Sequence, residues 1–219
     1  MDMNGFQANV EEYIFGAERS ELRADLMRVA IAVRNLLDPR GRFREWRFEL
    51  AKYAVTTIEE ELRRRYGEEI EASGKEAFFE GQKWNPVKFY KRSWKDADGR
   101  IPVFYAIDCN SNHFYEVYYG ISKASEHWPY DGENVPKALE GVTGGGFRTG
   151  QHWVGWRYFA EPWGGMYKDE FLEALAEAGR EGWAGLAREH YAEPFLMMVE
   201  NSIDAVDAYN REIVGKSRA

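Results

Sequence analysis

Two carboxylates and a lysine lie close together around one aromatic-rich stretch of the chain. Asp108 and Glu116 flank a polar break at residues 109–113, and Lys123 follows at the end of the second apolar run. Two carboxylates beside a cation can bind a divalent metal ion or transfer protons. The same residue types also form structural salt bridges at strand ends, and strand register decides which of them meet. Asp108, Glu116 and Lys123 are therefore the catalytic candidates of one hypothesis, a metal-dependent hydrolase.

The stretch that would position these residues, 101–123, predicts a β-hairpin. Its two runs are rich in aromatic and β-branched residues, which favour a pleated, half-buried surface. Asn110, Ser111 and Asn112 supply the turn, because short polar side chains hydrogen-bond to nearby backbone. We expect this hairpin in the middle of a sheet.

The chain before the hairpin is mostly helical in pattern. Apolar residues at helical spacing predict a pair of helices within 20–67, the first over about 22–37 and the second over about 43–66, followed by a polar connector over 68–86. Arginines gather around the joint between the two helices and form a candidate anion-binding patch, for which the alternative is an exposed, salt-bridged helix surface. The candidates in this patch are Arg40, Arg42, Arg44 and Arg47.

The remaining pattern completes an α+β fold within a single domain over residues 1–219. A loop rich in glycine and polar residues is expected over 124–151, and closing helices over 167–215, as separate pieces over 168–178, about 181–190 and about 193–214. We expect an antiparallel sheet of about four strands within 87–159, flanked by N-terminal and C-terminal helices. The expected strands are 87–94, 101–108, 114–122 and 152–159.

Composition and charge restrict the possible functions. The net charge is −8, and residues 101–219 carry all of the excess, with 18 acidic and 10 basic side chains, so binding of a polyanion by the whole surface is disfavoured. One cysteine excludes a disulfide framework, and no zinc or cofactor motif occurs, so we expect no metal and no cofactor. Without an apolar run of spanning length we expect no membrane partner and a cytoplasmic location.

The segments FYEVYYGISK and HWVGWRYF, separated by the long loop and followed by a terminal amphipathic helix, carry a resemblance to a known group. Their layout resembles the C-terminal region of phage- and defence-associated proteins of the PD-(D/E)XK nuclease superfamily, over about Leu22 to Tyr209. The catalytic signature of that superfamily ends in Asp/Glu-x-Lys, and this sequence contains no such tripeptide. The resemblance therefore implies a part of such proteins without catalytic residues.

These observations favour recognition over catalysis. The first hypothesis is a non-enzymatic recognition or accessory module of the phage and defence type, which binds a protein or nucleic-acid partner. The alternatives are a hydrolase or nuclease relative with a degenerate site, and a small-ligand pocket under the glycine-rich loop. Besides the arginine patch, the binding candidates are Tyr105, Tyr115, Tyr118, Tyr119, Trp153, Trp156 and Arg157. Packing in the core is the alternative role for each aromatic residue.

Overall fold

The computed structural model describes residues 42–80, 82, 84–109, 114–123 and 146–217, together with 23, 25, 26 and 29. Most of the helix expected over 22–37, the turn at 110–112 and the loop over 124–145 lie outside these residues. In chain order the elements are the helix α4 (Arg42–Tyr66), the strand β1 (Ile70–Ser73), the short helix α5 (Lys75–Phe79), β2 (Val87–Lys91), the 3-10 turn η2 (Arg92–Trp94), β3 (Val103–Cys109), β4 (Val117–Lys123), β5 (Arg148–Gly150), β6 (Trp153–Tyr158), α7 (Asp169–Ala187), the π-helical segment η3 (Arg188–Ala192) and α8 (Glu193–Ser217).

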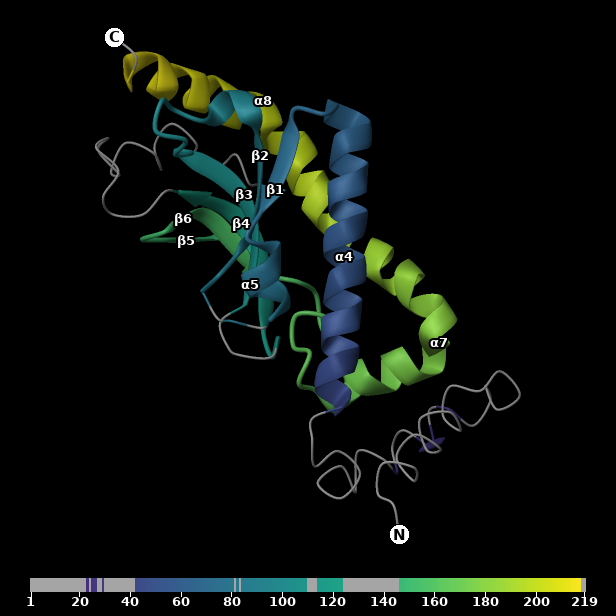
Figure 1. Cartoon of the computed structure of the whole chain (residues 1–219). Coiled ribbons are helices and arrows are strands. Elements are labelled where there is room, and N and C mark those ends of the chain that lie inside the picture. Colours follow the sequence, from purple (N-terminus) through teal and green to yellow (C-terminus); the bar gives the residue numbers. More distant parts are fainter. Residues whose placement is uncertain are drawn as a thin grey trace.

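The fold is α+β, with an antiparallel sheet flanked by helices, and the sheet has six strands where about four were expected. The strand order is β1-β2-β3-β4-β6-β5, and every neighbouring pair is antiparallel. The two additional strands are the edge strands, with four residues in β1 and three in β5. Segments this short show no measurable alternation, so the sequence pattern assigned them to a connector and a loop. Figure 1 shows α4 and α7 to the right of the sheet and β5 and β6 at its left.

Helix α4 agrees with the helix predicted over 43–66. Its buried residues recur every four positions and form one apolar stripe along the helix. The helix ends at Gly67, where φ is +77° and the backbone N–H bonds to the carbonyl of Arg63 at 2.8 Å, which is how glycine commonly closes a helix. The members of the stripe are Trp46, Leu50, Ala54, Ile58 and Leu62.

One face of the sheet, the inner face, packs against α8. The ring of Phe195 lies 5.3 Å from Phe89 of β2, 6.4 Å from Tyr105 of β3 and 6.1 Å from Tyr119 of β4. Asn210 of α8 adds a polar clamp, because its side-chain oxygen accepts the Val103 N–H at 3.1 Å while its amide donates to the Val103 carbonyl at 2.9 Å. Apolar packing and satisfied polar groups therefore fix α8 on the sheet.

The closing helices follow the sequence prediction closely. Separate helical pieces were expected on either side of residue 179, and α7 is interrupted at Gly179, where φ is +67°. Tyr191 in η3 donates a hydrogen bond of 2.8 Å to the carbonyl of Trp163 and so attaches the chain after β6 to the helices. In the described part of the chain, no helix is both long and apolar enough to cross a membrane.

Strands β4 and β6 approach each other at two glycines. A Cβ added at Gly120 would overlap the carbonyl oxygen of Gly155 and lie 2.8 Å from the Cα of Trp156. Both obstacles are backbone atoms of β6, which cannot move without breaking the pairing. Glycine at 120 is therefore a requirement of this pairing.

We predict that Gly120→Ala lowers the free energy of unfolding by about 2 kcal/mol or more, because the added methyl group forces the two strands apart. The matched control is Gly185→Ala on α7, where an added Cβ meets no atom within 4 Å. That change should be neutral or stabilise the protein by up to about 1 kcal/mol. Urea unfolding followed by circular dichroism measures both, and equal stability of the two variants would contradict the close approach.

Candidate functional site

The second face of the sheet, the outer face, carries the candidate site. Strand register places Lys88 opposite Ala106, Asp108 opposite Tyr118, and Gly120 opposite Trp156, so these side chains share one face. On this face Tyr118 contacts Trp153, Trp156 and Tyr158, and Tyr90 contacts Lys95 of the segment after β2. The inner face, by contrast, meets α8.

Four rings form one group on the outer face, here called the Tyr118 cluster: Tyr118, Trp153, Trp156 and Tyr158. The centroid of Tyr118 lies 5.5 Å from Trp153, 5.3 Å from Trp156 and 6.0 Å from Tyr158, each edge to face. Tyr118 is buried at the centre, whereas the other three rings are half-exposed. The cluster is therefore a continuous aromatic surface with one buried hub.

A bulge in β6 completes the cluster. With regular alternation, Val154 would share a face with Trp156 and Tyr158. The register shifts between Ile121 and Ser122, so that Trp153 lies opposite Ser122. A bulge changes the direction of side chains in this way. Here it places Trp153, instead of Val154, on the outer face.

Arg148 of β5 lies over this aromatic surface. Its guanidinium carbon is 5.4 Å from the centroid of Trp156 and 6.0 Å from that of Tyr158. The side chain is exposed and forms no ion pair with another described residue. A guanidinium held over aromatic rings keeps its charge, and its N–H donors stay available to a ligand.

Asp108 is the buried carboxylate beneath the same face. One of its oxygens accepts the N–H of Cys109 at 2.7 Å, and the other accepts the hydroxyl of Tyr118 at 3.1 Å. Burial raises the pKa of Asp108 from an ordinary 3.8 to about 6, although both hydrogen bonds act in the opposite direction. A carboxyl group with this pKa can change its charge near neutral pH.

The three catalytic candidates do not come together. Lys123 pairs with Val103 and Asp108 pairs with Tyr118, so they are five positions apart along the hairpin, which is about 17 Å. The pairing also directs Lys123 to the inner face. Glu116 lies just before β4 and is half-buried. In the described ranges, no group of three or more His, Cys, Asp and Glu side chains could hold a metal ion.

The predicted binding residues separate onto different surfaces. Tyr118, Trp153 and Trp156 belong to the outer face, as the cluster shows. Tyr105 and Tyr119 are inner-face residues in the core, where the Tyr105 hydroxyl lies 3.0 Å from that of Ser202. Arg157 pairs with Tyr119, and its guanidinium lies 5.4 Å from the ring of Phe147.

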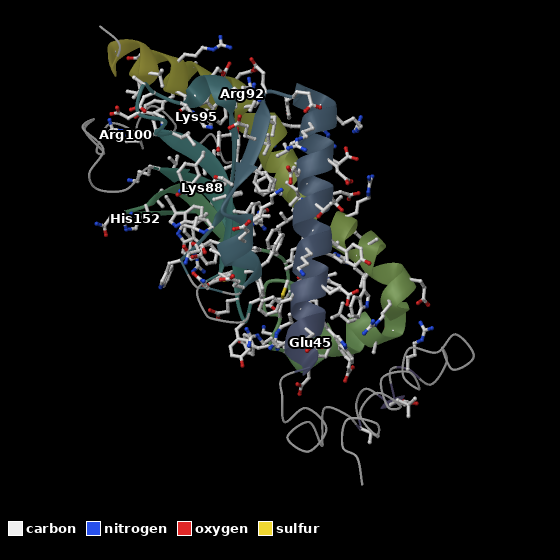
Figure 2. All side chains as sticks on the ribbon, in the orientation of Figure 1. Glu45, Lys88, Arg92, Lys95, Arg100 and His152 are labelled. Carbon is white, nitrogen blue, oxygen red and sulfur yellow. The ribbon has the colours of Figure 1, made fainter. Side chains whose placement is uncertain are left out.

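Arg44 and Arg47 of the arginine patch lie near the start of α4, and Tyr115 contacts Arg47 there. Arg44 lies 5.0 Å from the ring of Phe48, and Arg47 lies 5.0 Å from the ring of Tyr115. Figure 2 shows Glu45, their neighbour, at the lower end of α4 and well apart from Lys88 and His152. Arg40 and the side chain of Arg42 are outside the described residues.

Other cations near the sheet are compensated by acids. Arg92 and Lys95, at the upper end of the sheet in Figure 2, both bind Glu71, at 2.8 and 2.5 Å. Arg100 binds Asp96 at 3.2 Å and also Asp98. These side chains add little net charge to the outer face.

Sequence reasoning did not single out Arg148 and Tyr158. Arg148 was assigned to a flexible glycine-rich loop, because a strand of three residues shows no period. Tyr158 was part of the predicted strand. Its spacing of two residues from Trp156 was the signal that could have placed both rings on the same face of the sheet. Lys88 lies on β2, which is paired on both sides.

Comparisons with protein-family models, curated proteins and solved structures found no match to this chain. The resemblance drawn from its aromatic segments therefore stays a prediction.

We predict that the protein becomes more stable as the pH falls from about 7 to about 5. Asp108 binds its proton more tightly in the folded state than in the unfolded state, so folding gains about 1 kcal/mol across this window. The stabilisation that comes from protonation of Asp108 is absent well above the pKa of the folded state. It grows as the pH falls through that pKa. Glu61, Glu71 and Glu181 have lowered pKa values, so their contributions are lost only at more acidic pH.

Urea unfolding at several pH values measures this effect, and Asp108→Asn is the informative variant. Asparagine keeps the shape of the side chain without a titrating group, so the gain in stability should disappear. A variant that retains the full gain would show that another group is responsible.

Proposed function

We propose that this chain is a non-enzymatic recognition module that binds single-stranded nucleic acid along the outer face of its sheet. The observation that carries the proposal is the exposed Arg148 guanidinium held against the Tyr118 cluster. Aromatic faces that stack bases, beside cations that follow the phosphates, are the common means by which proteins bind single strands. The part of the proposal that assigns this module to phage or defence proteins is supported by the sequence resemblance alone.

The shape of the cluster supports a single-stranded ligand. Trp153, Trp156 and Tyr158 are half-exposed on the β5–β6 half of the outer face, which Figure 1 shows at the left of the molecule. Unstacked bases can lie against such rings, whereas the bases of a duplex are already stacked on each other. We therefore expect single strands to bind more tightly than duplexes of the same length.

The distribution of charge supports an anionic partner at this face. Residues 169–217, which form α7, η3 and α8, contain 11 acidic and four basic side chains. The negative net charge of the chain is therefore concentrated in these helical segments, while the β5–β6 hairpin exposes Arg148 and His152. A polyanion would approach this hairpin and avoid the helices.

The strand pairing separates two of the three residues of the hydrolase hypothesis, Asp108 and Lys123. The raised pKa of Asp108 suits a general acid or base. Lys123 is at the far end of the hairpin and faces the other side of the sheet. Recovery of the oligonucleotide after incubation with Mg²⁺ tests this alternative, and we expect it to be intact.

We predict that Arg148→Glu weakens the binding of a labelled oligothymidylate by about tenfold at about 50 mM salt, because it replaces a phosphate contact with a repulsion. The slope of log affinity against log salt concentration should also become less steep by about one unit. Fluorescence anisotropy with an oligonucleotide of about 16 nucleotides measures both quantities.

The matched control is Lys216→Glu in the last turn of α8, where the lysine pairs with Glu212. It changes the net charge by the same amount on α8, the helix that packs against the inner face, so affinity should stay within about twofold. Equal losses in the two variants would point to overall charge and not to a site. No binding of any single strand would refute the proposal and leave a protein partner to be identified by cross-linking.

A further inference from the structure

The buried carboxylate of Asp108 is directly joined to the hub of the aromatic surface. Tyr118 donates its hydroxyl to Asp108 at 3.1 Å, and the ring of Tyr118 contacts all three other members of the cluster. Asp108 is 4 % exposed. A change of charge at this position therefore acts on the outer face from within the protein, where screening by salt is weak.

Few charged groups face Asp108 from the neighbouring strands. Tyr118 of β4 bonds to it, Cys109 adjoins it on β3, and Lys88 of β2 lies on the same face opposite Ala106. Tyr158 of β6 and Arg148 of β5 lie beyond Tyr118. Lys88 contacts the ring of Phe104 at 5.0 Å and forms no ion pair with a described acid. Asp108 thus forms no ion pair with a described cation, and the other nearby acid in the sequence of this hairpin, Glu116, lies two residues before Tyr118.

We propose that Asp108 makes ligand binding at the outer face dependent on pH, so that nucleic acid binds more tightly when the carboxyl group is protonated. The ionised carboxylate opposes the phosphates that Arg148 and Lys88 attract, and protonation removes this opposition. Because burial raises the pKa of Asp108 to about 6, the change falls near physiological pH. This inference rests on the proposed function and adds its regulation.

The experiment measures the affinity of the whole chain for oligothymidylate at about pH 5 and about pH 7.5. Thymine and phosphodiester groups do not titrate in this range, so a change in affinity reports on the protein. We expect binding to be about fivefold tighter at the lower pH, the effect of removing one charge near the ligand. Asp108→Asn should bind with the same affinity at both values.

The control is His152→Gln, because His152 is an imidazole exposed on the β5–β6 hairpin, next to Trp153 of the cluster. This variant should retain most of the pH dependence. Calorimetry of the wild-type protein in two buffers of different ionisation enthalpy gives a second measurement that does not depend on a variant. It should detect proton uptake on binding near pH 6 and little near pH 8.

Each outcome bears on one proposal in particular. Binding whose pH dependence persists in Asp108→Asn, or is lost in His152→Gln, overturns the role of Asp108 and leaves the proposed function standing. If binding by the wild-type protein does not change with pH, the role of Asp108 is likewise overturned and the proposed function is left standing. No binding at either pH overturns both.

Discussion

The packing of Phe195 against three strands is the interaction on which the rest of the structure depends. Its ring contacts Phe89, Tyr105 and Tyr119, so one side chain of α8 joins β2, β3 and β4 on the inner face. Ser202 and Asn210 then bind Tyr105 and Val103 further along the same helix. Burial of the rings supplies most of the favourable free energy, and the hydrogen bonds fix the position of the helix along the strands.

Because strands alternate with a period of two, the fixed inner face determines what the outer face displays. Once Tyr119 faces α8, Tyr118 must point outward beside Asp108. The close approach at Gly120 brings β6 against β4, and the bulge in β6 directs Trp153 to the outer face. The aromatic surface is thus a consequence of how the core packs, combined with one irregularity.

Asp108 is the feature of this surface that packing alone does not require. A carboxylate with 4 % exposure is tolerated because two hydrogen bonds satisfy its oxygens, yet it still costs free energy when ionised. An asparagine of nearly the same shape, with its oxygen accepting the Cys109 N–H and its amide donating to the Tyr118 hydroxyl, would avoid that cost. Asp108 lowers stability when ionised and contacts the hub of the aromatic surface. Titratable groups in such environments are typical of functional sites.

The sequence by itself determined the α+β class, the helix at 43–66, the central hairpin and the break near residue 179, because each depends on a local pattern of apolar spacing or glycine. It also indicated Tyr118, Trp153 and Trp156 as aromatic candidates. Only the tertiary structure decided that Tyr105, Tyr119 and Arg157 point away from them, that Lys123 is far from Asp108, and that Arg148 lies over Trp156. Those facts depend on strand register, a bulge and two edge strands of three and four residues. Pairing between distant segments sets all of them, and no local pattern in the chain encodes it.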